Sequence, residues 1–161
     1  MSALHLRHAR AGDLEGLLAV YAQLNPDDPI PDHPRLAAIL QRIVDSEQFA
    51  IIVATQADTL VATCYLNVIP NLTRGGASYA VIENVVVDAT LRGGGIGQQV
   101  VRRALDEAWQ RGCYKALLQT GSRDPRVHRF YEACGFSASE KTGFVARPPR
   151  AASQGQRSPA T

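Results

Sequence analysis

The chain has 161 residues, of which 45% are apolar and 20% are charged, the balance of one ordinary globular domain with a substantial core. Its formal net charge of +2 gives no reason to expect a nucleic-acid-binding or membrane-binding surface. No apolar run approaches the length of a membrane span, and the N-terminus lacks the long apolar stretch of a signal peptide. We therefore expect a single cytoplasmic domain.

The cysteines and histidines give no sign of a disulfide framework or a metal site. Three cysteines are an odd number, and neither they nor the four histidines have the spacing of metal ligands. We expect reduced thiols, as in a cytoplasmic protein, and no bound metal. Cys64 lies in a strand-like run and Cys134 on a helix face, so we expect both to be small, buried, apolar side chains.

The first half of the chain predicts a strand, two helices and a hairpin. Apolar residues alternate between Leu4 and Ala9, as in a strand, and Asp13 marks the start of a helix. Residues 25–34 hold four prolines and three aspartates and predict a loop. A second helix is expected at about 35–47. Strands at 49–54 and 60–68, joined by a tight turn at 56–59, predict a hairpin.

The second half predicts a strand, a helix, a strand, a helix and a weak last strand. A buried strand is expected from Tyr79 to Val87, followed by a glycine cluster and a helix that Gly112 ends. A strand at 114–119, a helix from Asp124 to Gly135 and a weak strand or strand pair at 138–146 follow. Residues 148–161 have no apolar pattern, so we expect one domain at 1–147 and a disordered tail. The order predicts an α/β (α+β) fold with a mixed, mostly antiparallel central sheet flanked by helices.

The glycine cluster after the buried strand is the most informative motif. Its glycines, at positions 93, 94, 95 and 97, open a helix and leave backbone N–H groups bare at its positive end, which favours a bound diphosphate. A GxxxxGK[ST] loop is excluded because Gln98 and Gln99 follow, and GxGxxG is excluded because its last position is Gln98. The same run would also serve as a strand-to-helix turn without a ligand.

The remaining pattern resembles a known family. Arg92-x-x-Gly95-x-Gly97 is similar to the acetyl-CoA pyrophosphate loop of the GNAT N-acetyltransferases, [RQ]-x-x-G-x-[GA]. Three further runs resemble glucosamine-6-phosphate N-acetyltransferases, whereas the segment Ile69-Pro70-Asn71-Leu72-Thr73-Arg74-Gly75-Gly76 resembles that of a bacterial branch of the superfamily. The resemblance covers roughly residues 4–145 and implies splayed central strands with the pantetheine arm between them. The runs are Ile82-Glu83-Asn84-Val85-Val86-Val87, Gly112-Cys113-Tyr114-Lys115 and Phe130-Tyr131-Glu132-Ala133-Cys134-Gly135-Phe136.

The resemblance implies where acetyl-CoA, the expected co-substrate, would bind. The backbone N–H groups of Gly93, Gly94, Gly95, Ile96 and Gly97 would hold the diphosphate, with the Arg92 guanidinium nearby. The N–H of Val86 would bind the thioester oxygen, while Val85 and Val87 would pair with the pantetheine amides. Each of these residues also has a simpler reading, Arg92 as a solvated loop cation and the three valines as core strand.

Two side chains are candidates for proton transfer. Glu83 is the one carboxylate in an apolar strand, where an unpaired charge is costly, so we expect it to face a wet cleft. It could be the base that deprotonates the amine, a substrate ligand or a structural group. Tyr131 matches the family's general-acid tyrosine, which the cofactor also contacts. A phenol keeps its proton at pH 7 and could protonate the leaving thiolate, although spacing alone would make it a core residue.

The acceptor is less well specified. Asn84 stands where the sugar-phosphate enzymes have aspartate, which argues against assigning their acceptor to this chain. Asp27, Asp28 and Asp32 could attract an amine, Arg74 could attract a phosphate or carboxylate, and Tyr79 could line the same mouth. We expect direct acetyl transfer to the primary amine of a small molecule. The alternatives are transfer to a protein or peptide and a non-catalytic CoA-binding module, and the family also suggests a homodimer.

Overall fold

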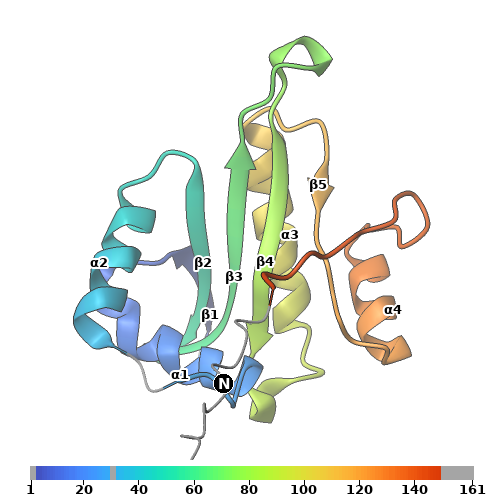
Figure 1. Cartoon of the computed structure of the whole chain (residues 1–161). Helices are drawn as coiled ribbons and strands as arrows, with labels where there is room; N and C mark the ends of the chain where they lie inside the picture. The colour runs from blue at the N-terminus through green and yellow to red at the C-terminus, as the bar shows by residue number, and fades with distance from the viewer. Residues whose placement is uncertain (1–2, 30–31, 150–161) are drawn as a thin grey trace, which may run out of the picture.

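A computed structural model describes residues 3–29 and 32–149. Five strands form one sheet in the order β1-β2-β3-β4-β5 (Figure 1). The first four strands pair in antiparallel fashion, whereas β4 and β5 are parallel. The strands are β1 (Leu4–His8), β2 (Phe49–Gln56), β3 (Thr59–Ile69), β4 (Tyr79–Val87) and β5 (Ala116–Leu117), and the helices are α1 (Leu14–Leu24), α2 (His33–Val44), α3 (Ile96–Gln110) and α4 (Pro125–Ala133).

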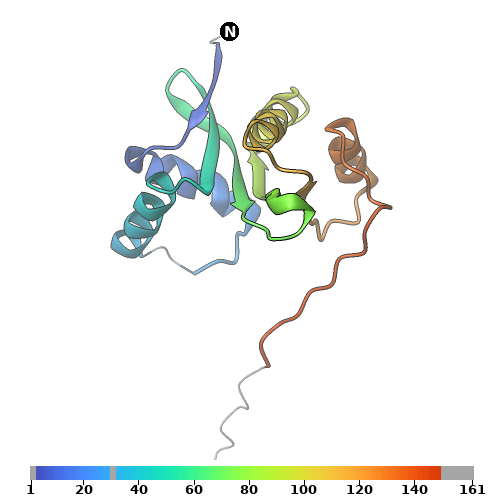
Figure 2. The same ribbon diagram turned by 90° about the horizontal axis from the view of Figure 1, so that it is seen from above.

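Helices cover both faces of the sheet, as the apolar pattern predicts (Figure 2). Leu17 of α1 and Leu40 of α2 pack with Ile51 and Val53 of β2 on one face. The buried side of α3, centred on Val100 and its neighbours, packs on the other face. The mixed sheet with helical flanks confirms the predicted fold class.

Most element boundaries lie within a few residues of those predicted. The second helix begins at His33 instead of 35, because Asp32 caps it through its carboxylate, which accepts from Arg35 N at 3.2 Å. Pro34 fits the first turn, where no N–H is needed. The helix ends at Val44 rather than at about 47. The three cysteines are free and buried, which confirms the apolar reading of Cys64 and Cys134.

The C-terminal part differs from the prediction. The strand expected at 114–119 contains only Ala116 and Leu117, and the prediction of a strand or strand pair at 138–146 was wrong, since those residues form neither helix nor strand. A strand needs a neighbour to satisfy its backbone, and this segment instead runs away from the sheet (Figure 2). Of the predicted tail, residues 148 and 149 lack regular structure and 150–161 lie outside the described residues. No helix among the described residues is long and apolar enough to cross a membrane.

Gly97 lets three elements meet at the start of α3. A Cβ atom built on it would lie 3.1 Å from Phe130 Cε2 of α4 and 3.1 Å from Val87 Cγ2 of β4. Both distances are shorter than ordinary van der Waals contacts. The glycine therefore fixes how closely α3 approaches the end of β4, independently of any ligand.

We predict that Gly97→Ala lowers the free energy of unfolding by about 1 kcal/mol or more, because overpacking outweighs the better helix propensity of alanine. Urea denaturation of the full chain measures this. Gly12→Ala is the matched control, since a Cβ there meets nothing within 4 Å. Equal stability of the two variants would contradict the packing role.

Candidate functional site

An irregularity in the middle of β4 shapes the site. Tyr65 of β3 pairs with Glu83, whereas Thr63 pairs with Val86. This is a β-bulge. Asn84 adopts φ +50°, a left-handed conformation that asparagine tolerates better than most residues. Glu83 and Asn84 are both exposed at this point.

The bulge reverses which side chains of β4 face α3. Before it, Ala80 and Ile82 belong to the core beneath α3; after it, Val85 and Val87 pack there instead. The directions of the backbone N–H groups can be read from one hydrogen bond. Asp88 N donates to Val61 O at 2.8 Å, so alternation sends the N–H of Val86 toward β3 and those of Val85 and Val87 toward β5.

On the β5 side, those groups meet a gap. β4 and β5 pair only through Ala80 with Ala116 and Val81 with Leu117. Beyond these pairs the strands part, as the family resemblance implied. The bulge and the valines that follow it lie in the part of β4 that pairs with β3 but not with β5. The gap therefore begins beside Glu83 and runs toward the glycine cluster.

The glycine cluster closes that end of the gap. Gly93 and Gly95 have φ +84° and +78°, a region that favours glycine. Gly95 is the residue that precedes the first turn of α3, so the first N–H groups of that helix point outward beside the loop. Arg92 is exposed, and its Nε donates to Val87 O at 3.2 Å, which holds the guanidinium at the mouth of the gap.

Tyr131, on α4, is half-buried between two aromatic rings. Its ring centroid lies 4.9 Å from that of Phe130 and 6.2 Å from that of Phe136, both edge to face. Burial raises the pKa of its phenol, and the nearby Cys134, Cys64 and Glu83 raise it further. Glu83, another of the predicted residues, is therefore among the groups whose charge raises the pKa of Tyr131.

Glu83 belongs to a face of the sheet that the helices leave partly open. Tyr79, Val81 and Glu83 alternate on one side of β4, the side on which Tyr65 packs with α1 and α2. Of those helices, α2 lies against β2 and α1 against β3 and β4, yet Glu83 stays exposed and Tyr79 and Val81 half-buried. The open part of this face carries a carboxylate at the bulge and an aromatic ring near the start of the strand.

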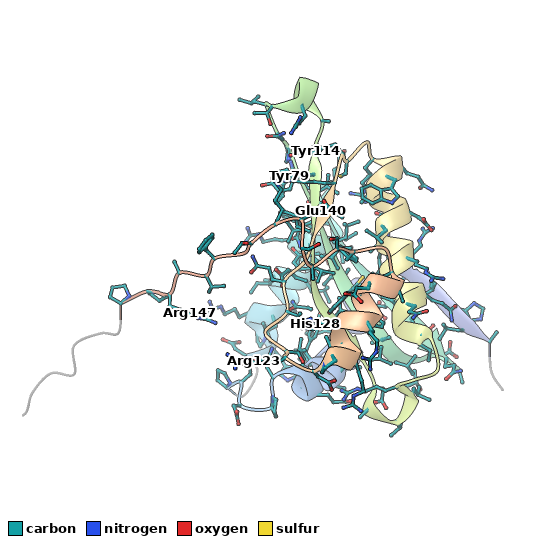
Figure 3. All side chains as sticks on the ribbon, turned by 90° about the vertical axis from the view of Figure 1, so that its right-hand side faces the viewer. Tyr79, Tyr114, Arg123, His128, Glu140 and Arg147 are labelled. Carbon is teal, nitrogen blue, oxygen red and sulfur yellow. The ribbon has the colours of Figure 1, made fainter. Side chains whose placement is uncertain are left out.

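Sequence reasoning missed Lys115, which completes the far end of this face. Its Nζ lies 5.4 Å from the ring centre of Tyr79 and 5.3 Å from that of Tyr114, while the Arg74 guanidinium lies 5.9 Å from the Tyr114 ring. These are cation–π contacts. The two labelled tyrosines lie close together near the tip of the β3–β4 hairpin (Figure 3). Only the parallel pairing of β5 with β4 brings Lys115 beside Tyr79, so no local pattern indicates it.

A groove lies on the other side of β5. Its volume is about 800 Å³, and α3, β5, α4 and the segment after α4 line it, with Trp109, Leu118, Tyr131 and Phe136 among its residues. It includes Tyr131 but not Glu83 or the glycine cluster. The groove therefore follows the open edge of β5, and the bulge and glycine cluster are the better candidate for a reaction site because they bring together polar groups suited to chemistry.

Within residues 3–29 and 32–149, no three histidine, cysteine, aspartate or glutamate side chains are grouped so as to hold a metal ion. The groups that the fold gathers around the gap are instead backbone N–H groups, one carboxylate and one phenol.

Comparison with known proteins identifies the family. Residues 17–136 match the model of the acetyltransferase (GNAT) family. The chain belongs to this family. Its N-acetyltransferase relatives include glucosamine 6-phosphate N-acetyltransferase 1 of Oryza sativa subsp. japonica, which is 32% identical over 137 residues, covering 83% of this chain and 81% of the relative.

Solved structures agree with this assignment. A protein of Agrobacterium tumefaciens str. C58, provisionally named an acetyltransferase, is 46% identical with a TM-score of 0.84, covering 89% of this chain and 99% of its own. The aminoglycoside N-acetyltransferase AAC(6')-Iy, solved with CoA, has a TM-score of 0.76 at 17% identity, covering 92% of this chain and 97% of its own; at that identity it shows a shared fold alone. The recognised family, the GNAT fold and the enzyme class are thereby confirmed: this chain is a GNAT-type N-acetyltransferase.

The bulge generates a prediction for this GNAT chain. Asn84→Ala should destabilise the fold by about 1 kcal/mol more than Asn84→Gly, because alanine is strained at φ +50° and glycine is not. Thermal and urea unfolding of the two variants measure the difference. Equal stabilities would contradict the strain predicted for alanine at position 84.

Proposed function

We propose that this GNAT enzyme transfers the acetyl group of acetyl-CoA to the primary amine of a small molecule by direct attack. The observation that carries the proposal is the gap in the sheet, which connects the glycine cluster at the start of α3 with the bulge at Asn84. The names of curated relatives, which are N-acetyltransferases of glucosamine 6-phosphate, support a small acceptor. The low net charge of +2 supports it as well.

The donor half rests on backbone groups. The N–H groups of residues 93–97 and the guanidinium of Arg92 hold the diphosphate, and the pantetheine arm lies in the gap. Strand alternation favours the N–H of Val85, rather than that of Val86, as the donor to the thioester oxygen. Val87 then pairs with a pantetheine amide, and the side chain of Val86 serves the core, where it is 5% exposed. An oxyanion donor of this kind contributes about two to three orders of magnitude in rate.

The chemical step needs one proton acceptor and one proton donor. The neutral amine nitrogen attacks the thioester carbonyl carbon and forms a tetrahedral intermediate. Its C–S bond breaks, the leaving thiolate takes a proton from the Tyr131 hydroxyl, and the proton that the new amide nitrogen loses passes through water to the Tyr131 phenolate. The raised pKa of Tyr131 keeps the phenol protonated until that moment. Glu83 faces the open side of the bulge, where its carboxylate either removes a proton from the incoming ammonium or binds it.

The acceptor lies along the open face of β4. Glu83 and Asn84 mark the end where the amine reacts. Tyr79 offers a ring, while Lys115 and Arg74 supply positive charge at the far end. An acceptor with an amine at one end and an anionic or hydroxyl-rich group at the other fits this distribution of charge. Three buried free cysteines suit a reducing, cytoplasmic compartment.

Association of two copies is part of the proposal. The arm, defined as residues 139–149, projects from the body (Figure 2), and its Phe144 and Val145 are 89% and 68% exposed. β5 is one of the two edge strands of the sheet, the other being β1, and an unpaired edge invites another strand. A homodimer in which the arm of one copy meets the β5 edge of the other would cover both.

The proposed function is tested by incubating the full chain with acetyl-CoA and a panel of amines while measuring free thiol. The panel contains amino sugars, amino-sugar phosphates, aminoglycosides, and peptides with a free N-terminus or a lysine. Thiol release that depends on a small amine supports the proposal. Release with peptides alone favours a protein acetyltransferase, and CoA binding without release with any acceptor favours a CoA-binding module.

We expect Tyr131→Phe to lower kcat by about 10²-fold or more with little change in the Kd for CoA, because it removes only the proton that the thiolate takes. The aromatic contacts with Phe130 and Phe136 remain, so the fold is retained. Tyr114→Phe is a matched control, since Tyr114 lies near the tip of the β3–β4 hairpin (Figure 3). Unchanged turnover in Tyr131→Phe would remove the acid role.

A further inference from the structure

A side chain outside the GNAT motifs connects α1 to the segment that leads into the glycine cluster. Gln23 lies in the last turn of α1. Its Nε2 donates to Asp88 Oδ2 at 3.0 Å, and its Oε1 accepts from Ala89 N at 2.9 Å. One amide group therefore satisfies a carboxylate oxygen and a backbone N–H 65 and 66 positions away.

The segment that Gln23 binds determines where the glycine cluster begins. Asp88 directly follows β4, and its other carboxylate oxygen, Oδ1, accepts from Thr90 N at 2.9 Å and Thr90 Oγ1 at 2.5 Å. Leu91 N donates to Asp88 O at 2.9 Å, which closes the single turn before Arg92. These bonds, that from Gln23 included, lower the pKa of the Asp88 carboxyl, so it stays ionised as an acceptor at neutral pH.

The donor and acceptor atoms in this pair have one arrangement only. Asp88 offers oxygen alone, and Ala89 offers N–H alone, so the amide of Gln23 must present nitrogen to the first and oxygen to the second. A rotated amide would oppose like groups at both positions. The exposed pair contributes little to overall stability, but it fixes the direction in which the chain enters the turn.

We propose that Gln23 is a positioning residue for the diphosphate loop, which it holds through Asp88 and Ala89 in the arrangement that binds CoA. The proposal rests on the proposed donor site at residues 92–97. It also joins the end of α1 to the donor side of the site. Donor affinity thereby depends on a residue that touches neither CoA nor the acceptor.

The test exchanges the two partners. Gln23→Glu places a second carboxylate against that of Asp88. Asp88→Asn places its amide N–H against the amide N–H of Gln23 or, if the Gln23 amide rotates, places the Gln23 N–H against the N–H of Ala89. In the double variant Q23E/D88N, the nitrogen of the new amide at position 88 donates to an oxygen of the new carboxylate at position 23, and the oxygen of that amide still accepts from Thr90. That carboxylate still accepts from Ala89 N, so the pair is restored with reversed polarity. CoA affinity of the full chain is measured by calorimetry, and urea denaturation of each variant is measured alongside.

We expect each single variant to raise the Kd for CoA by about three- to tenfold, the loss of one to two hydrogen bonds, and the double variant to return it to within about twofold of wild type. Gln41→Glu is the matched control. Gln41 Nε2 donates to Asp45 Oδ1 at 2.8 Å on α2, so this substitution creates the same carboxylate pair away from the loop and should leave the Kd unchanged.

The outcomes separate this proposal from the proposed function. Wild-type affinity in Gln23→Glu, or a double variant as weak as the two singles combined, overturns the positioning role while the donor site stands. An equal loss of affinity in Gln41→Glu would show a general effect of added charge and overturn it as well. A wild-type chain that does not bind CoA overturns the donor site and this proposal together.

Discussion

The site depends on a single interruption of hydrogen bonding in the sheet. β4 is paired on both sides near its start, but beyond Val81 its β5 side has no strand partner, and the bulge at Asn84 shifts its alternation by one residue. Buried backbone groups need partners. A strand that is paired on one side and open on the other therefore offers a row of N–H and C=O groups to an extended molecule. The amides in the pantetheine arm of CoA are suited to form hydrogen bonds with such a row.

The same interruption explains how β4 accommodates a candidate proton-transfer group. Glu83 would be an expensive residue in the middle of a buried strand, yet the bulge leaves it exposed. Tyr131 lies on α4, where the ring of the preceding residue, Phe130, lies against Gly97 of α3. A small glycine in α3 thus lets an aromatic residue of α4 come close, and the next residue of α4 is the candidate acid.

The features that could be predicted from the sequence are those encoded locally. Helical spacing gave the helices within a few residues, and the glycine cluster identified the turn into α3, where Gly93 and Gly95 adopt positive φ angles that few other residues tolerate. The bulge was not predicted, since Asn84 is an ordinary residue in a strand-like run. Lys115 and the Gln23–Asp88 pair were missed because strand order and helix packing bring them together across long sequence separations. No strand forms at 138–146, because a strand-like sequence forms a strand only where another strand lies beside it to pair with its backbone.

The groove beside β5 has an optical consequence. Trp109 is the one tryptophan in the 161 residues, it lines that groove, and it is 47% exposed. Indole emission shifts to shorter wavelength when water is displaced from the ring, so all tryptophan fluorescence of this protein comes from the boundary between a wet groove and the core. The chain therefore carries its own reporter of whether that groove is filled, by the arm of a second copy or by anything else, without a label.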